Sequence, residues 1–262
     1  QNCGCADSKF RESSSRALDG VIMKILNIAH RGFSSKYPEN TLLAFREGMQ
    51  AGADGFECDL RLTADGHVVV FHDDDLKRLC GQKGSIESLP LSEVRKLRVF
   101  GREPIPTLED MLLEFHTTRI NLEIKMSQRD AVVVETVLRT LTKVRPSGEI
   151  LFSSFSPEVI RSLNVMNKDH SLGKHGLLVE TSCLALLPEM SAELQPSTWN
   201  VPKQIMNAPW DKRWGLEMTP PLWIWTVDEP DQWARVLRSP LPFEAIITNK
   251  PDALSSFLAA SG

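Results

Sequence analysis

The stretch GFECDLRLTADGHVVVFH, residues 55–72, decides the fold. It contains two strand-like runs that only a tight Asp-Gly turn at 65–66 separates. Such a turn joins antiparallel strands, because a parallel crossover needs a dozen or more residues. We therefore expect a strand that overshoots the rim of its sheet and folds back. The return would bring His72 level with Glu57 and Asp59.

Outside this hairpin, short apolar runs alternate with helical patterns, which is typical of repeated βα units on a parallel sheet. An eighth strand, poorly formed, is expected at residues 192–197 (AELQPS). Eight units in about 240 residues match a TIM (β/α)8 barrel in size. We therefore expect an α/β fold, with a short insertion at residues 74–106 on the C-terminal face of the barrel. The other seven runs are ILNIAH, GFECDL, INLEIK, ILFSSF, HGLLVE, LWIWTV and EAIITN.

The first helix and the domain limits also follow from local patterns. The segment TLLAFREGMQAG predicts a helix, with Asn40 as its N-cap and Gly52 as its stop. Residues 1–22 are polar and serine-rich, and we interpret them as a flexible leader, tag or arm. Residues 23–262 are expected to form one domain.

Composition restricts the class of protein. The 262 residues are 42% hydrophobic with a formal charge of -4, which disfavours a nucleic-acid-binding protein. No window approaches 18 consecutive apolar residues, so no membrane span is expected. Five cysteines do not form the pattern of a disulfide framework in a chain of this length. Because no apolar signal-peptide segment is visible, we expect a cytoplasmic protein.

Three carboxylates are predicted to share the interior of the barrel. Residues i and i+2 of a strand lie on one face, so Glu57 and Asp59 point away from Cys58, and Glu123 lies beside Lys125. Each pair is within ~7 Å at the rise of a strand. Carboxylates at strand ends are oxygen ligands of the kind that Mg²⁺ or Ca²⁺ prefers.

The same carboxylates have a second interpretation. Lys125 and Arg31 would neutralise them in a buried salt-bridge network without any metal. Spacing alone leaves the two interpretations equally open.

Two histidines, His30 and His72, each close a strand at the predicted rim. A histidine is often structural, but a pair beside carboxylates is typical of acid–base catalysis. Arg31 and Lys125 would suit a phosphate group. Neither a GxSxG elbow nor a P-loop occurs, so acyl transfer and nucleotide-driven chemistry are disfavoured.

An ordered set of motifs runs over about residues 25–254. The segments are AHRG (29–32), PEN (38–40), ECD (57–59), TADG (63–66), VVFHD (69–73), IPTLEDML (105–112), LEIK (122–125), SSF (153–155), IWTVD (224–228) and IITNKPD (246–252). With this set the chain resembles the glycerophosphodiester phosphodiesterases, within a superfamily that includes the phosphatidylinositol-specific phospholipase C-like phosphodiesterases. The resemblance implies a TIM-barrel hydrolase that cleaves a small-molecule glycerophosphodiester to glycerol 3-phosphate and an alcohol.

The resemblance also implies roles for individual residues. His30 and His72 would be the acid–base pair, and Arg31, Lys125 and Trp225 would bind substrate. Glu39 would support the loop after the first strand. One divalent cation, Mg²⁺ or Ca²⁺, would be held by Glu57, Asp59 and Glu123.

Two other functions remain open at this point. A lysophospholipase D or sphingomyelinase D-like activity on the same barrel would need an apolar groove, to which Trp199, Trp210, Trp214 and Trp223 are candidates to contribute. A catalytically inactive phosphodiester-binding module is the other alternative. Asn249 stands where the family often has an acidic residue, and no role is predicted for it. The short insertion after His72 favours a small polar substrate over a long lipid.

Overall fold

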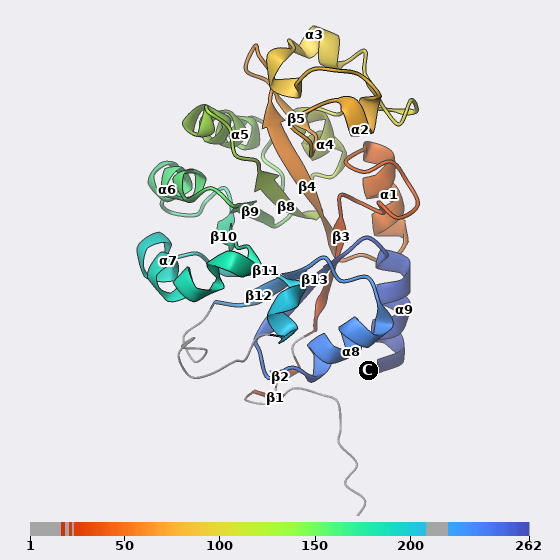
Figure 1. The fold of residues 1–262 in the computed structure, drawn as a ribbon, viewed down its shortest axis with the longest axis vertical. Coiled ribbons are helices and arrows are strands. Elements are labelled where there is room, and N and C mark those ends of the chain that lie inside the picture. Colours follow the sequence, from red (N-terminus) through yellow and green to blue (C-terminus); the bar gives the residue numbers. More distant parts are fainter. Residues whose placement is uncertain (1–16, 19–20, 23, 208–219, 262) are drawn as a thin grey trace, which may run out of the picture.

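The computed structural model describes residues 17–18, 21–22, 24–207 and 220–261 (Figure 1). Eight parallel strands close into a barrel, because the first strand pairs with both the second and the last. In the order in which they pair, the strands are β3 (Leu26–His30), β4 (Gly55–Leu62), β8 (Arg119–Ile124), β9 (Ile150–Ser154), β10 (Lys174–Leu178), β11 (Thr198–Pro202), β12 (Leu222–Trp225) and β13 (Phe243–Thr248). The predicted TIM barrel is confirmed.

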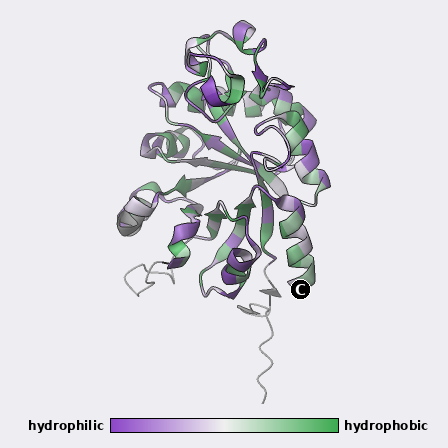
Figure 2. Ribbon diagram, turned by 45° about the vertical axis from the view of Figure 1, so that its right-hand side comes forward, coloured by the Kyte–Doolittle hydropathy of each residue, from purple (hydrophilic) through white to green (hydrophobic). Residues whose placement is uncertain are grey.

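Helices surround this barrel and connect most successive strands (Figure 1). Between β11 and β12, the described residues form only the 3-10 helix η3 (Lys203–Asn207). Apolar residues of the outer strand faces, such as Phe56, Cys58 and Leu60, pack with helix residues in one large core. A smaller cluster, which includes Ile28 and Trp223, fills the barrel itself. Hydrophobic residues, green in Figure 2, run along the strands and alternate with hydrophilic ones on the helices. The helices are α1 (Leu42–Gln50), α4 (Leu108–Glu114), α5 (Asp130–Val144), α6 (Pro157–Met166), α7 (Leu187–Leu194), α8 (Pro230–Arg238) and α9 (Pro251–Ser261).

The fold-back hairpin is present as expected. Strand β5 (Val68–Val70) pairs antiparallel with the distal half of β4. The backbone N–H of Phe71 then donates to the carbonyl of Asp59 at 2.8 Å. The next residue, His72, is thereby returned to the level of the inward carboxylates.

The insertion after the hairpin is a small folded unit on the top of the barrel (Figure 1). It has its own hydrophobic cluster, in which Leu76, Leu79 and Ile86 are completely buried. Its elements are α2 (Lys77–Cys80), the 3-10 helix η1 (Ile86–Ser88), α3 (Leu91–Val94), and the paired strands β6 (Arg98–Val99) and β7 (Glu103–Pro104).

Two local predictions were wrong. The sixth barrel strand is β11 at Thr198–Pro202, whereas residues 192–194 belong to the end of α7. Thr198 and Asn200 of β11 are buried and polar, so the strand shows no apolar run. The N-cap of α1 is Thr41, whose side chain accepts from the Ala44 N–H, and not Asn40.

Most of the expected leader, residues 1–22, lies outside the described residues. The four that are described form two-residue strands, β1 (Ala17–Leu18) and β2 (Val21–Ile22), which pair antiparallel. Every helix within the described ranges is too short or too polar to cross a bilayer.

Candidate active site

Strand register gathers the predicted site residues at the C-terminal end of the barrel. Residue His30 of β3 pairs with Glu57 of β4, and Asp59 of β4 pairs with Glu123 of β8. Catalytic groups of TIM barrels lie at this end of the strands.

The three carboxylates form one compact cluster. Each of Glu57, Asp59 and Glu123 is buried and offers an oxygen within 4.8 Å of the others. Asn40 holds Asp59 from two sides, because its Nδ2 donates to Asp59 Oδ2 at 2.7 Å and its Oδ1 accepts from the Asp59 N–H at 3.2 Å. This contact explains why Asn40 is not available as a helix cap.

The salt-bridge interpretation also has support, because both predicted cations contact the cluster. Lys125 Nζ lies 2.8 Å from Asp59 Oδ1 and also contacts Glu123 Oε1. Arg31 Nε lies 3.2 Å from Asp59 Oδ2. Burial alone would raise the pKa of Asp59, but Lys125 and Arg31 outweigh it and hold that pKa well below its usual range.

These two side chains do not neutralise the whole cluster. Burial, together with repulsion from Asp59 and Glu123, raises the pKa of Glu57 well above its usual value. Burial, followed by repulsion from Asp59, also raises the pKa of Glu123. Oxygen Oε1 of Glu57 is buried and has no hydrogen-bond partner. When all three carboxylates are ionised, they exceed the two cations by one negative charge, so the cluster fits an additional cation.

His30 is held by an amide. Its Nδ1 lies 2.7 Å from Oδ1 of Asn249, and its Nε2 lies 3.9 Å from Oε2 of Glu57. Burial and the positive charge of Arg31 lower the pKa of His30 to about 4. At neutral pH this imidazole is therefore uncharged.

His72 is held by a carboxylate. Its Nδ1 lies 2.7 Å from Oδ1 of Asp73, the next residue in the chain. Burial lowers the pKa of His72, while Asp59 and Asp73 oppose that shift. Arg78 and His72 in turn lower the pKa of Asp73 to about 2 against the effect of its burial, so Asp73 is ionised at neutral pH.

Both histidines line a hollow of about 240 Å³ in the mouth of the barrel. Arg31, Glu57, Glu123 and Lys125 form its polar wall. Phe155 and Trp225 form an apolar wall in which their rings meet edge to face, 5.7 Å between centroids.

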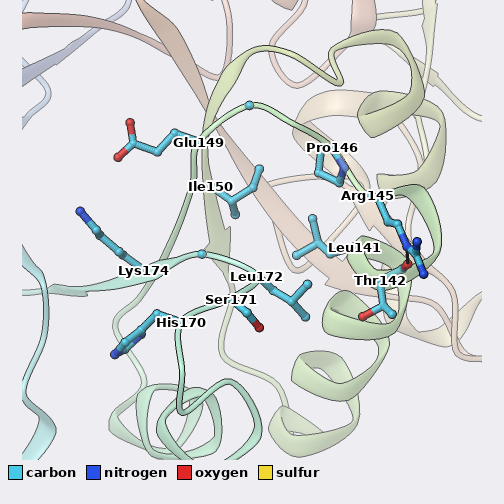
Figure 3. A pocket seen from close by; sticks show the side chains of 12 residues that line it. Leu141, Thr142, Arg145, Pro146, Glu149, Ile150, His170, Ser171, Leu172 and Lys174 are labelled. Carbon is cyan, nitrogen blue, oxygen red and sulfur yellow. Dashed lines mark hydrogen bonds between the residues drawn. The ribbon is translucent and has the colours of Figure 1, made fainter.

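A second hollow, of about 500 Å³, lies at the opposite end of the barrel (Figure 3). Leu141, Ile150 and Leu172 lie in its centre, and His170 and Lys174 lie on one side. Ile150 begins β9 and Lys174 begins β10, so the hollow is at the N-terminal ends of these strands. It contains none of the predicted site residues.

A model of the glycerophosphoryl diester phosphodiesterase family matches residues 30–194. The chain belongs to this family. It is 31% identical over 257 residues to a glycerophosphodiester phosphodiesterase of Caldanaerobacter subterraneus subsp. tengcongensis, an alignment that covers 92% of this chain and all of the relative.

Solved structures agree with the barrel. A glycerophosphodiester phosphodiesterase of Thermotoga maritima has a TM-score of 0.74 at 28% identity, over 89% of this chain and 98% of that one. A phosphodiesterase of Oleispira antarctica, solved with its product sn-glycerol-3-phosphate, has a TM-score of 0.79 at 23% identity, over 88% and 96%. The predicted family, fold and enzyme class are confirmed.

In this member of the glycerophosphoryl diester phosphodiesterase family, all nine predicted site residues lie at one end of the barrel. Eight of them line the hollow or belong to the carboxylate cluster: His30, Arg31, Glu57, Asp59, His72, Glu123, Lys125 and Trp225. Glu39 does not line the hollow, but its Oε1 accepts a hydrogen bond from Nη1 of Arg31, which does, at 2.9 Å.

Sequence reasoning missed the residues that orient the histidines, namely Asp73, Arg78, Asp228 and Asn249. Asp73 and Asp228 end two of the family motifs, so their positions carried a signal that was not used. Arg78 lies in the insertion and follows no periodic pattern. Asn249 was left without a role because the family often has an acidic residue there.

Proposed function

We propose that the protein hydrolyses glycerophosphodiesters to glycerol 3-phosphate and an alcohol, with a divalent cation at the carboxylate cluster and His30 and His72 as proton-transfer groups. One observation carries the proposal: a buried, incompletely neutralised carboxylate cluster faces two histidines across a single hollow. Family membership supports the substrate class, and the product named with the Oleispira antarctica phosphodiesterase is sn-glycerol-3-phosphate.

Glu57, Asp59 and Glu123 would hold the cation, since they are oxygen ligands of the type that Mg²⁺ and Ca²⁺ select. The unpartnered Oε1 of Glu57 supports this assignment. When bound, such a cation supplies electrostatic stabilisation of the negative charge that develops on the phosphate.

The two histidines would have different tasks. His30 is neutral, and its Nδ1 faces the Asn249 amide oxygen, so its Nε2 is the bare nitrogen that accepts a proton from the nucleophile. His72 contacts the ionised Asp73, which opposes the lowering of the His72 pKa by burial and so favours a protonated imidazole. His72 would therefore donate the proton that the leaving alkoxide needs.

The remaining residues would bind the substrate. Lys125 lines the hollow beside Glu123, and its ammonium, which already contacts Asp59 and Glu123, would also bind the phosphate. Arg31 also lines the hollow, although its Nε and Nη1 contact Asp59 and Glu39, so it acts with a fixed orientation. Trp225 and Phe155 would pack against the carbon atoms of the glycerol or the alcohol.

The lysophospholipase D or sphingomyelinase D-like alternative is not favoured. Trp199 and Trp223, two candidates for an apolar groove, are buried in the core, and Trp210 and Trp214 lie outside the described residues. The hollow of about 240 Å³ adjoins another of about 520 Å³, whose lining is mainly charged and includes Arg61, Asp73 and Asp74, and such a lining suits a polar substrate better than a long acyl chain.

Turnover of glycerophosphocholine and lysophosphatidylcholine by one chelator-treated preparation tests the proposal. We expect glycerol 3-phosphate from glycerophosphocholine only after Mg²⁺ or Ca²⁺ is added back. Full activity in the presence of excess chelator would refute the role of the cation. Faster cleavage of lysophosphatidylcholine would refute the substrate class.

A further inference from the structure

Arg78 of the insertion hydrogen-bonds to two carboxylates, those of Asp73 and Glu39. Its Nε and Nη2 donate to Asp73 at 2.8 and 2.7 Å, and its Nη1 and Nη2 donate to Glu39 at 2.7 and 2.9 Å. Both contacts are bidentate, which is the geometry in which a guanidinium holds a carboxylate most rigidly.

Each of these carboxylates also holds a residue of the active site, and it does so through an oxygen that Arg78 contacts. Asp73 Oδ1 lies 2.7 Å from Nδ1 of His72. Glu39 Oε1 accepts from Nη1 of Arg31 at 2.9 Å. One continuous chain of hydrogen bonds therefore links His72 to Arg31, with Arg78 at its centre.

We propose that Arg78 is a positioning residue, which sets the orientation of His72 and Arg31 relative to each other from outside the hollow. The inference rests on the proposed roles of these two residues. It assigns the insertion a task beyond covering the barrel, because Arg78 of the insertion is connected through Asp73 to His72 and through Glu39 to Arg31.

Direct contact of Arg78 with substrate is a weaker interpretation. Four of its five N–H donors point to Asp73 and Glu39. Arg78 lines neither the hollow that contains both histidines nor the adjoining hollow of about 520 Å³, which His72, Asp73 and Lys125 line. An isolated surface ion pair also fits poorly, because Arg78 has the bidentate geometry and the network of several charges that distinguish ion pairs with a measurable effect.

The insertion fixes Arg78 through its own core. Helix α2 is a single turn, which would not be stable alone in water. Leu76 and Leu79 on either side of Arg78 are buried in the hydrophobic cluster of the insertion. In addition, the Phe100 N–H donates to the Leu79 carbonyl at 2.6 Å. The guanidinium therefore extends from an anchored backbone.

The chain offers a matched control in Arg46. Its side chain is 48% exposed, against 46% for Arg78, and its Nε and Nη2 both donate to Glu114. Glu114 holds no predicted site residue. Loss of Arg46 therefore removes a similar ion pair without disturbing the site.

The test compares Arg78→Ala, Arg78→Lys and Arg46→Ala in glycerophosphocholine hydrolysis and in thermal unfolding. Displacement of catalytic groups by about 1 Å costs about 100-fold. We expect a loss of that order in kcat for both Arg78 variants, because lysine cannot bridge two carboxylates bidentately. Arg46→Ala should keep the wild-type kcat. Added ethylguanidine should restore part of the activity of Arg78→Ala, with no effect on Arg46→Ala.

A second readout does not depend on turnover. In protein with ¹⁵N-labelled histidine, the Nδ1–H resonance of His72 should shift or broaden in Arg78→Ala and stay unchanged in Arg46→Ala. Wild-type kcat in either Arg78 variant, or an unchanged His72 resonance in Arg78→Ala, would overturn the inference. If wild-type protein cleaved no glycerophosphodiester, the proposed function would fail, and the resonance would still decide the role of Arg78.

Discussion

Oδ1 of Asn249 lies 2.7 Å from Nδ1 of His30, although the two residues are 219 positions apart in the sequence. Asp228 determines which end of the amide faces the histidine. Its Oδ2 accepts from Asn249 Nδ2 at 2.7 Å, and its Oδ1 accepts from the Asn249 backbone N–H at 2.8 Å. A carboxylate only accepts, so the amide oxygen must point to His30. The proton of neutral His30 is therefore on Nδ1.

Replacement of Asn249 by alanine should lower kcat by about 10- to 100-fold, the usual effect of losing a residue that orients a functional histidine. Asp228→Ala should act in the same direction, because it frees the amide to rotate. Asn164→Ala is the control, since Asn164 bonds only to the carbonyl of Leu194 among the contacts described. Equal kcat values for Asn249→Ala and Asn164→Ala would show that His30 needs no such support.

Replacement of Glu57 by glutamine should lower both the affinity for the divalent cation and the turnover rate. The change keeps the volume of the side chain and removes one of three carboxylate charges. In wild-type protein, saturation with Mg²⁺ or Ca²⁺ at 100 times its Kd should stabilise the fold by about 2.7 kcal/mol. Calorimetry should show this gain reduced in Glu57→Gln and retained in Glu114→Gln. An equal gain in both variants would place the cation elsewhere.

Glu57 and Glu123 should each lower the stability of the chelator-treated protein as the pH rises above the usual carboxyl range. The pKa values of Glu57 and Glu123 are raised by burial and by neighbouring carboxylates, so the folded state keeps protons that the unfolded state has released. Raising the pH through this interval therefore costs stability. The lowered pKa of Asp59 acts oppositely, and its contribution is lost only in more acidic solution.

Denaturant titrations between pH 4 and pH 8 measure this slope. Because the lowered pKa of His30 adds stability as the pH rises through part of the same interval, the test is the difference between variants. Relative to wild type, Glu57→Gln should lose less stability, or gain more, as the pH rises, and a bound divalent cation should shift wild type in the same direction. Equal pH dependence of stability in wild type and Glu57→Gln would contradict a raised pKa of Glu57.

Replacement of Gly32 by alanine should damage both fold and activity. Gly32 has a φ of +79°, and a Cβ there would lie 2.5 Å from the backbone carbon of Ala44. Gly101 has a similar φ of +69° with no atom within 4 Å of its Cβ position. Gly101→Ala should therefore lose only about 1 kcal/mol of stability, the cost of a left-handed backbone for a residue with a Cβ. Gly32→Ala should cost about 1–3 kcal/mol more, because it also overpacks α1.

Activity distinguishes the two glycines further. Gly32 follows His30 and Arg31 directly, so a shift of its backbone moves both. Gly101→Ala should keep the wild-type kcat, and Gly32→Ala should not. Chemical denaturation and turnover on the same preparations are the measurements, and equal losses in both variants would contradict this reading.

The sequence predicted those features that depend on periodicity. Alternation along GFECDL and INLEIK was enough to place Glu57, Asp59 and Glu123 on one face, and the turn at 65–66 was enough to return His72 to them. The sixth strand was misplaced because Thr198 and Asn200 point into the barrel and hydrogen-bond to each other, which removes the apolar signal.

No periodic pattern in the sequence predicted the contacts that orient His30 and His72. The bond between His30 and Asn249 joins the first and last strands, and its direction depends on Asp228 from a third segment. Arg78 reaches Glu39 over 39 residues from an irregular insertion. Such pairs follow from the closure of the barrel, and local spacing in the sequence does not encode them.

In the proposed mechanism, His30 accepts a proton from the nucleophile and His72 donates one to the leaving group. The most direct measurement compares His30→Ala and His72→Ala on glycerophosphocholine and on a glycerophosphodiester with a p-nitrophenyl leaving group. Both variants should lose about 100- to 10,000-fold on glycerophosphocholine, the usual contribution of acid–base groups. Because p-nitrophenolate leaves without protonation, His72→Ala alone should recover most of its activity on the second substrate. Near-normal turnover of glycerophosphocholine by either variant, or recovery by His30→Ala alone, would contradict the account.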